Sequence, residues 1–331
     1  MTRVLAVVPC LNEAAHLPKL LAQLAADPDI ALVVVADGGS TDGSRAIVVE
    51  LADGNPKLCL LDNPARIQSA GINLAVQRYG SGYDWLLRVD AHCQYPDHYA
   101  ATLLGAAAST GAQSIVVTML TKANAGFQTA VAAAQNSVIG TGGSPHRHLV
   151  SGRFVDHGHH ALMDINAFKA AGGYCEAMPC NEDAELDHRL LRNGNKIWLE
   201  PSAAVEYFPR STALSLWRQY FKYGVGRARM LRRHQVRPAL RQVLPLLVPI
   251  ALATAVLAPL HWIFVVPLTT WMSLMLLAGV IIGLAKRSHW ALLSGLAAAI
   301  MHLAWGAGFL RERLRISKAP TPRYGFMPPR T

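Results

Sequence analysis

Residues 31–51 read ALVVVADGGSTDGSRAIVVEL, and this stretch is typical of one fold class. Its first six residues are continuously apolar, which is typical of a strand buried on both faces of a parallel sheet. The strand is expected to end at Asp37, before a glycine-rich turn and a helix over 46–51. The stretch therefore predicts one strand–turn–helix unit of an α/β sheet.

The same order repeats on both sides of this unit. Apolar runs predict three further strands, and apolar residues at helical spacing predict two further helices. The strands are expected over 4–8, 58–61 and 85–89, and the helices over 14–26 and 68–78. Strands that alternate with helices imply a doubly wound, mostly parallel α/β sheet.

Polar side chains follow three of these strands. The segment from Pro9 to Glu13, Asp37, and the pair Asp90 and His92 all fall at the carboxyl ends of strands, where open α/β sheets bind ligands. On an extended chain Asp90 and His92 share one face, so a carboxylate and an imidazole can hold one divalent cation. A loop histidine without a metal is the alternative. Neither a GxxxxGK[ST] nor a GxGxxG phosphate loop occurs.

The chain is 52% apolar and only 16% charged, and the excess lies near the C-terminus. Three apolar runs cover 243–260, 262–285 and 290–310. Because a membrane helix needs roughly 20 apolar residues, the second and third runs qualify and the first is marginal. The expected division is a cytosolic domain over 1–235, a basic linker over 236–242, a membrane region of two or three helical segments over 243–310, and a basic tail over 311–331.

The formal net charge is +10, and seven Lys or Arg with no Asp or Glu lie within 222–241. This cluster suits anionic lipids at the cytoplasmic face of a membrane, and no nucleic-acid-binding module accompanies it. The tail is basic too, so both flanks of the membrane region are expected inside, which requires an even number of crossings. Three runs conflict with that number. The sequence leaves the number of crossings open, although the proline-rich first run could be interfacial or re-entrant.

Cysteine and histidine give no metal-site pattern. The five cysteines form no CxxC pair, which favours free thiols in a reducing compartment. Five histidines gather in the middle of the chain, but their spacing matches no ligand pattern, and loop or acceptor-side positions are favoured. They are His146, His148, His157, His159 and His160.

Five motifs, taken in order, resemble those of family 2 glycosyltransferases with the GT-A fold. They are VVPCLNE, VVVADGGSTDGS, NPARIQSAGINLAV, LLRVDAH and NEDAEL, and the resemblance covers about residues 1–235. The segments GGYCEAMPCNEDAELDHRL, EYFPR and QYFKYGVGR look most similar to the branch of the family that builds bacterial exopolysaccharides. The resemblance implies a nucleotide-sugar donor, with UDP-glucose the expected one.

The resemblance also implies roles on the donor side. Glu13, in the segment that begins at Pro9, and Asp37 match residues that hold the uracil and ribose of the donor. Gly38 stands where the family usually has a second Asp, so one family carboxylate is missing. Arg66 matches the segment that faces the nucleotide.

At the reacting end, Asp90 and His92 occupy the family's DxD position as DxH, which implies Mg²⁺ or Mn²⁺ on the diphosphate. Asp183 matches the base that removes the proton of the acceptor hydroxyl. Glu182 is equally well explained as an acid favoured by the helix dipole. Arg227 is either a diphosphate clamp or membrane-surface charge. The QxxRW segment of processive members is absent, which favours transfer of one sugar per encounter.

Taken together, the resemblance implies an inverting, metal-dependent, non-processive hexosyltransferase. It is expected at the bacterial inner membrane as a multi-pass protein with its catalytic domain on the cytoplasmic face. The expected acceptor is a polyprenyl diphosphate-linked sugar. A polyprenyl-phosphate sugar synthase is the alternative enzyme, and a membrane-anchored, non-catalytic nucleotide-sugar-binding subunit is the alternative from another class.

Overall fold

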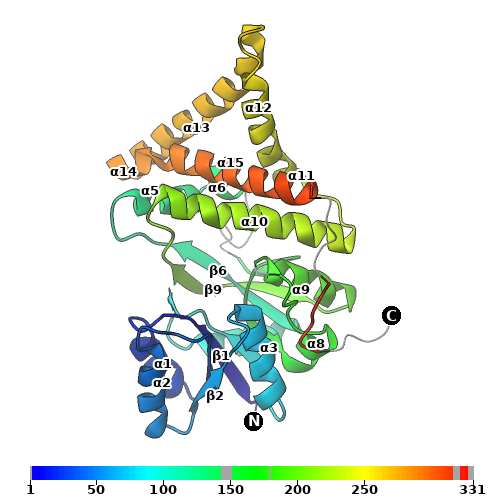
Figure 1. Cartoon of the computed structure of the whole chain (residues 1–331). Coiled ribbons are helices and arrows are strands. Elements are labelled where there is room, and N and C mark those ends of the chain that lie inside the picture. The colour runs from blue at the N-terminus through cyan, green and yellow to red at the C-terminus, as the bar shows by residue number, and fades with distance from the viewer. Residues whose placement is uncertain (1, 143–150, 179, 316–320, 327–331) are drawn as a thin grey trace. The chain divides into compact units, whose positions relative to one another are not determined.

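The chain folds into two compact units that are interleaved along the sequence (Figure 1). The computed structural model describes residues 2–142, 151–178, 180–315 and 321–326, except for the side chain of Arg241. The first unit comprises Met1–Met119, Leu149–Tyr207 and Thr321–Thr331, and the second comprises Leu120–His148 and Phe208–Pro320. The division at residues 235, 242 and 310 stays a prediction.

The first unit is built on one sheet with the strand order β3-β2-β1-β4-β8-β6-β9-β5, and β7 pairs with β9. The strands are β1 (Val4–Cys10), β2 (Ile30–Asp37), β3 (Leu58–Asp62), β4 (Trp85–Arg88), β5 (Cys93–Gln94), β6 (Ser114–Thr121), β7 (Arg153–Phe154), β8 (His159–Asp164) and β9 (Ile197–Tyr207). The first four pair in parallel, as the sequence predicts. The pairs β4–β8, β6–β8, β5–β9 and β7–β9 are antiparallel, so the complete sheet is a mixed one.

Both faces of the parallel strands are buried, which explains their continuous apolar sequences. In β1, Val4, Ala6 and Val8 join one core cluster with α1 (Leu17–Ala26) and α4 (Tyr99–Thr110). Leu5 and Val7 point the other way, into a second cluster. That second cluster includes buried residues of α3 (Gln68–Tyr79), α8 (Ile165–Ala170) and α9 (Glu182–Arg192).

The strand register brings the carboxyl ends of the parallel strands level with one another. Cys10 at the end of β1 pairs with Asp37 at the end of β2, and Asp37 pairs with Asp62 at the end of β3. The chain continues from Asp37 through the glycine-rich turn into α2 (Ser44–Asp53). The predicted ligand edge of the sheet is therefore present.

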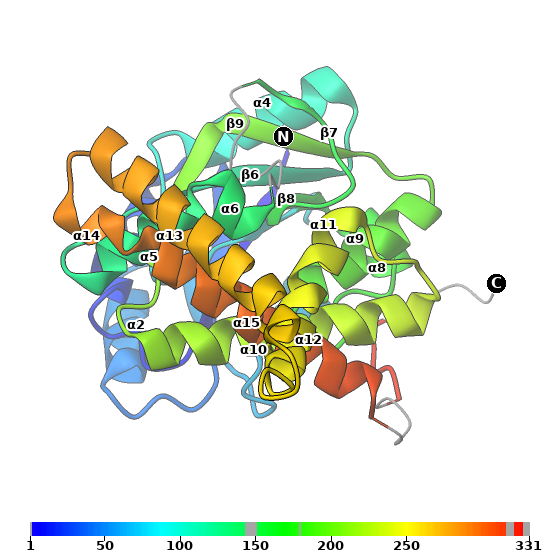
Figure 2. The same ribbon diagram turned by 90° about the horizontal axis from the view of Figure 1, so that it is seen from above.

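The second unit is helical. Its elements are α5 (Phe127–Gln135), α6 (Val138–Thr141), α10 (Ala213–His234), α11 (Leu240–Val243), η1 (Leu244–Leu246), α12 (Leu247–Ala255), η2 (Trp262–Val265), α13 (Val266–Ala285), α14 (His289–Leu292) and α15 (Ser294–Arg313). Two stretches, Trp262–Ala285 and His289–Arg313, are long and apolar enough to cross a membrane, and Leu244–Ala255 is a shorter apolar helix. Within this unit α12 and α13 converge at a tip, which points towards the viewer in Figure 2.

Helices α10 and α15 pack closely along their length (Figure 1). A Cβ atom on Gly224 of α10 would lie 2.0 Å from the carbonyl oxygen of Trp305, and one on Gly308 of α15 would lie 2.1 Å from that of Phe221. Because neither position has room for a side chain, the two glycines set the close approach of the helices.

The described part of the C-terminal tail packs on the first unit. The amide of Phe326 donates to the carbonyl of Gly172 at 3.0 Å. The ring of Phe326 meets that of Phe168 edge-on, with 6.0 Å between centroids. The guanidinium of Arg189 lies 4.7 Å from the ring centroid of Tyr324. The chain therefore returns to the sheet-bearing unit after α15 ends.

Candidate active site

A cleft of about 240 Å³ opens at the carboxyl ends of β1, β2 and β4 in the first unit. Five of the residues singled out in the sequence line this cleft. They are Pro9, Glu13, Arg66, Asp90 and His92. Residues from three separate motifs thus meet because parallel strands present their carboxyl ends on one edge.

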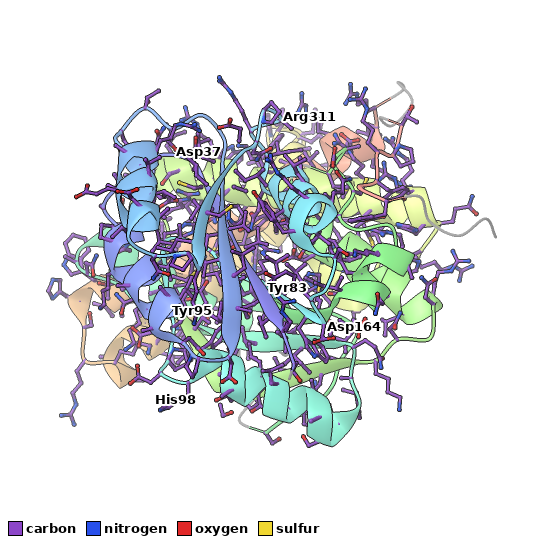
Figure 3. All side chains as sticks on the ribbon, turned by 90° about the horizontal axis from the view of Figure 1, so that it is seen from below. Asp37, Tyr83, Tyr95, His98, Asp164 and Arg311 are labelled. Atoms are coloured by element: carbon purple, nitrogen blue, oxygen red, sulfur yellow. The ribbon has the colours of Figure 1, made fainter. Side chains whose placement is uncertain are left out.

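Asp37 lies directly beside this cleft, between the lining residues Ala36 and Gly38, and is only 2% exposed (Figure 3). Its carboxylate accepts hydrogen bonds from the Ser40 hydroxyl at 2.5 Å and from the Arg45 guanidinium at 2.9 Å. Burial acts to raise the pKa of Asp37, but these donors outweigh it and the pKa is lowered. The side chain therefore organises the turn after β2, and its contact with a ribose stays a prediction.

Little space surrounds Gly38, the position at which the family usually has a second Asp. A Cβ on Gly38 would lie 3.3 Å from the Cα of Arg66 and 3.5 Å from the carbonyl oxygen of Cys10. Arg66 itself has a positive φ of 58°, a conformation that few side chains adopt. The backbone of the two loops packs closely at this point, so a side chain at position 38 would be tightly confined.

Asp90 is held firmly by its neighbours. Its Oδ1 accepts hydrogen bonds from the side-chain amide of Gln68 at 2.8 Å and from Nε of Arg88 at 3.3 Å. Its backbone amide donates to the hydroxyl of Tyr95 at 2.7 Å. Burial acts to raise the pKa of Asp90, but the charges of Arg88, His159 and His92 lower it to about 2. Asp90 is therefore an anion at neutral pH.

His92 lines the same cleft as Asp90 and is 47% exposed, with Nδ1 at 3.2 Å from Glu13 Oε1. In the described part of the chain, no group of three or more His, Cys, Asp or Glu side chains is arranged to hold a metal ion. Mg²⁺ is commonly held by one or two carboxylates together with substrate phosphates. A site of Asp90, His92 and donor diphosphate oxygens fits that chemistry.

Arg88 was not singled out in the sequence, and it connects the two sides of the site. It is the last residue of β4 and is 5% exposed. Besides Asp90, its guanidinium pairs with Asp183 and lies 3.9 Å from Glu182. A single buried cation is thus shared by three carboxylates, one from the segment that follows β4 and two from the start of α9.

The two acids at the start of α9 differ in protonation. Burial acts to raise the pKa of Asp183, but the Arg88 charge, supported by His160 and His159, outweighs it and lowers the pKa. Burial and the neighbouring Asp183 raise the pKa of Glu182 to about 7. Asp183 is therefore ionised at neutral pH, and Glu182 carries a proton for part of the time.

Glu182→Gln should stabilise the protein at alkaline pH and do so much less at pH 5. A folded-state pKa of about 7 for Glu182, above the ordinary 4.5, means that its protonated form favours folding. That stability is complete below the ordinary pKa and is lost as the pH rises through 7. Glutamine mimics the protonated acid. Thermal unfolding in detergent at pH 8.5 should therefore show that the free energy of unfolding of the variant exceeds that of the wild type by at least about 1 kcal/mol.

The matched control for this substitution is Glu50→Gln on the exposed surface of α2. Its effect on unfolding should be the same at pH 5 and at pH 8.5. Equal effects of Glu182→Gln at the two pH values would show that Glu182 is ionised throughout this range.

Behind Asp183 lies a buried polar network that the histidine-rich segment supplies. Asp187 is fully buried and accepts from His157 Nδ1 at 2.8 Å and His160 Nε2 at 2.7 Å. The other ring nitrogen of His160 lies 2.7 Å from the hydroxyl of Tyr174 and 3.7 Å from Asp183. Burial acts to lower the pKa of His160, but Asp187 and Asp183 outweigh it and the pKa is raised.

Three histidines of the same group remain. His159 lies 3.7 Å from Asp90, and burial lowers its pKa to about 4. His146 and His148 lie outside the described residues. The preference for loop or acceptor-side positions therefore stays a prediction for those two, whereas His157, His159 and His160 pair with carboxylates of the site.

Arg227 belongs to the second unit, where it is half-buried on α10. Its contribution to diphosphate binding stays a prediction. The helix on which it lies carries the basic sequence that precedes the first apolar run.

Comparison with known proteins gives the family. The model of "Glycosyl transferase family 2" matches residues 5–170. The chain is 50% identical over 316 residues to the "Succinoglycan biosynthesis protein ExoA" of Rhizobium meliloti (strain 1021), which covers 95% of this chain and 96% of that protein.

A solved structure is similar in fold. The mannosyltransferase PcManGT from Pyrobaculum calidifontis, in complex with GDP-Man and Mn²⁺, superposes with a TM-score of 0.61 at 16% identity. The match covers 93% of this chain and 87% of that one. The mixed α/β sheet is therefore GT-A-like, as the sequence motifs imply. From the family match and the extended identity, the chain belongs to glycosyltransferase family 2 and is a transferase.

Proposed function

We propose that this protein transfers one hexose per encounter, glucose from UDP-glucose, to a lipid-linked sugar during bacterial exopolysaccharide synthesis. The reaction inverts the anomeric configuration and uses a divalent metal ion. The catalytic unit works at the cytoplasmic face of the inner membrane. The arrangement that carries the proposal is the buried Arg88, which joins Asp90 on the donor side of the site to Asp183 on the acceptor side.

The proposed chemistry is a single displacement. The acceptor hydroxyl oxygen forms a bond to the anomeric carbon, the bond from that carbon to the diphosphate breaks, and its electron pair leaves with UDP. Asp183, ionised beside Arg88, accepts the hydroxyl proton. One displacement at the anomeric carbon inverts its configuration.

Asp90 and His92 are the residues that would hold Mg²⁺ or Mn²⁺. The ion, when bound, supplies positive charge against the charge that grows on the leaving diphosphate. Glu13, 3.2 Å from His92, orients the imidazole, and Arg88 keeps Asp90 ionised. The mannosyltransferase PcManGT, which is similar in fold, was solved with GDP-Man and Mn²⁺, and this supports a metal-bound donor here.

Different observations support the proposed donor and the proposed acceptor. Half of all residues are identical to a succinoglycan biosynthesis protein over nearly the whole of both chains, which supports an exopolysaccharide pathway. The two apolar helical stretches and the adjacent basic cluster on α10 support a membrane-bound acceptor. The cleft residues support a nucleotide-sugar donor and do not by themselves select glucose.

The test is transfer from a panel of labelled UDP-hexoses by detergent-purified protein, with Mn²⁺ or with a chelator. Acceptors are extracted lipid-linked sugars and bare polyprenyl phosphate. Metal-dependent transfer of glucose to a lipid-linked sugar is expected. Transfer to bare polyprenyl phosphate would instead identify a polyprenyl-phosphate sugar synthase, and no transfer from any donor would identify a non-catalytic nucleotide-sugar-binding subunit.

His92→Ala should weaken Mn²⁺-dependent binding of UDP by at least about tenfold, because the metal would lose one of its two protein ligands. Titration calorimetry with UDP, with and without Mn²⁺, measures the effect. His16→Ala is the matched control, since His16 is 54% exposed and lies 4.0 Å from the same Glu13 without lining the cleft. Equal UDP affinity in the His92 variant and the wild type would make His92 a loop residue without a metal.

A further inference from the structure

We propose that a single apolar hairpin, residues 244–285, enters the lipid bilayer, and that α15 stays on the side of the catalytic unit without crossing. The hairpin consists of η1 and α12 as one arm, the tip over 256–261, and η2 and α13 as the other arm. This proposal rests on the membrane attachment proposed above and does not depend on the identity of the sugar.

The surface of the hairpin matches a hydrocarbon solvent. Only 6% of the most apolar stretch of Trp262–Ala285 is buried, and no Asp, Glu, Lys or Arg occurs over 244–285. Large apolar side chains are exposed on both arms and at the tip, among them Leu247 (54%), Leu260 (77%) and Ile281 (59%). The 24 residues of the second arm exceed the roughly 20 that a bilayer crossing requires.

Helix α15 has the length of a membrane span but the packing of a core helix. More than half of its most apolar stretch, 56%, is buried within the structure. Ala297, Ala298 and Met301 form one core cluster with Ala130 and Val131 of α5. The imidazole of His302 in α15 places Nε2 at 2.7 Å from the carbonyl oxygen of Ile139 in α6.

Helix α10, which also packs against α15, is too charged to lie in hydrocarbon. Helix α10 carries Lys and Arg residues along its length, and its Arg229 forms a buried ion pair with Glu312 of α15 at 3.2 Å. Arg232 lies 3.1 Å from the same carboxylate. Because charged side chains at the centre of a bilayer cost several kcal/mol, the α10–α15 pair belongs outside the hydrocarbon.

Short connecting segments limit how far the first residues of α5 and α10 can lie from the strands that precede them. Only residues 122–126 link β6 to α5, and only residues 208–212 link β9 to α10. Five linking residues reach at most about 20 Å, which is less than the roughly 30 Å thickness of the hydrocarbon core. Since α15 packs on both helices, it lies on the same side of the bilayer as the first unit.

The tail and the charges lead to the same topology. Residues 323–326 pack on the first unit, so the chain before and after the apolar runs lies on one side, and the number of crossings is even. Lys286 and Arg287 separate α13 from α15, whereas the tip over 256–261 holds no Lys or Arg. The positive-inside rule therefore places the α13–α15 turn in the cytoplasm and the tip away from it.

Two cysteine substitutions test the proposal in the full-length protein. Leu260→Cys marks the tip, and His289→Cys marks the exposed turn before α15. A membrane-impermeant maleimide is applied to spheroplasts and to inverted membrane vesicles. Wild-type protein, with its five native cysteines, gives the background, and labelling after detergent lysis shows that each introduced thiol can react.

His289→Cys should react in inverted vesicles and stay protected in spheroplasts, while Leu260→Cys should show the reverse. Protection of Leu260→Cys in both preparations would still support the proposal, with the hairpin turning back inside the bilayer. Labelling of His289→Cys in spheroplasts, or of Leu260→Cys in inverted vesicles, would overturn it. The sugar-transfer assay measures the proposed function separately, so either proposal can fail while the other stands.

Discussion

Asp183→Asn is expected to lower the rate of sugar transfer by about 10²- to 10⁴-fold, the usual contribution of a general base, and to leave UDP binding unchanged. Asparagine keeps the size of the side chain but cannot accept the proton of the attacking hydroxyl. Because Asp183 is ionised beside Arg88 and 3.7 Å from His160, it is ready to take that proton at neutral pH. Initial rates with saturating donor and calorimetric UDP binding measure the two effects.

Glu182→Gln is the matched control, since it removes a carboxylate from the adjacent residue in the same turn of α9. Glu182 is also the rival base, because its pKa of about 7 lies close to the pH at which the enzyme works. Retention of most of the activity in this variant is expected. If Glu182→Gln loses transfer while Asp183→Asn keeps it, the base is Glu182 and the role taken from the family motif is wrong for this chain.

The first four strands and the cleft could be predicted from the sequence because their information is local. A strand buried on both faces is continuously apolar, and parallel strands bring their carboxyl ends together, so Glu13, Asp90 and His92 could be placed at one edge. The antiparallel half of the sheet was missed. Strands β8 and β9 pair with β4, β6, β5 and β7, which lie far from them in the sequence. Hydrophobic periodicity along the chain does not indicate such pairing.

Arg88 and the buried ion pairs behind the site were also missed, although the sequence contains indications of both. Arg88 is a charged residue at the end of an apolar strand, which is costly unless a partner is buried with it. The histidines at 157, 159 and 160 follow no metal-ligand spacing, and Asp187 on α9 pairs with two of them. Length and apolar composition predict a membrane span over 290–310, whereas the burial of α15 against α5 and α10 is a tertiary property that the sequence does not show.

Arg88→Met should destabilise the first unit by about 3–5 kcal/mol, the usual cost of removing one partner from a buried ion pair. Arg88 is 5% exposed, and its removal leaves Asp90, Asp183 and Glu182 close together without the cation that they share. Thermal unfolding in detergent measures the loss. Sugar transfer should disappear as well, because both the donor-side and the acceptor-side carboxylates depend on this guanidinium.

The pH dependence separates this electrostatic role from simple packing. Arg88 lowers the pKa of Asp90 and Asp183, so its stabilising effect is present above their ordinary pKa values and is lost as the pH falls through the lowered ones. The difference in stability between Arg88→Met and the wild type should therefore shrink below pH 4. A difference that stays constant with pH would mean that the guanidinium acts through its volume.

Arg88→Lys is the matched variant, because it keeps the charge and loses the geometry. One ammonium group cannot reach Asp90, Asp183 and the hydroxyl of Tyr174 together, whereas the guanidinium contacts all three. Lysine should therefore restore much of the thermal stability but little of the transfer rate. Full recovery of thermal stability and transfer rate by lysine would contradict a bridging role. A point charge would then be enough to hold the donor-side and acceptor-side carboxylates in place.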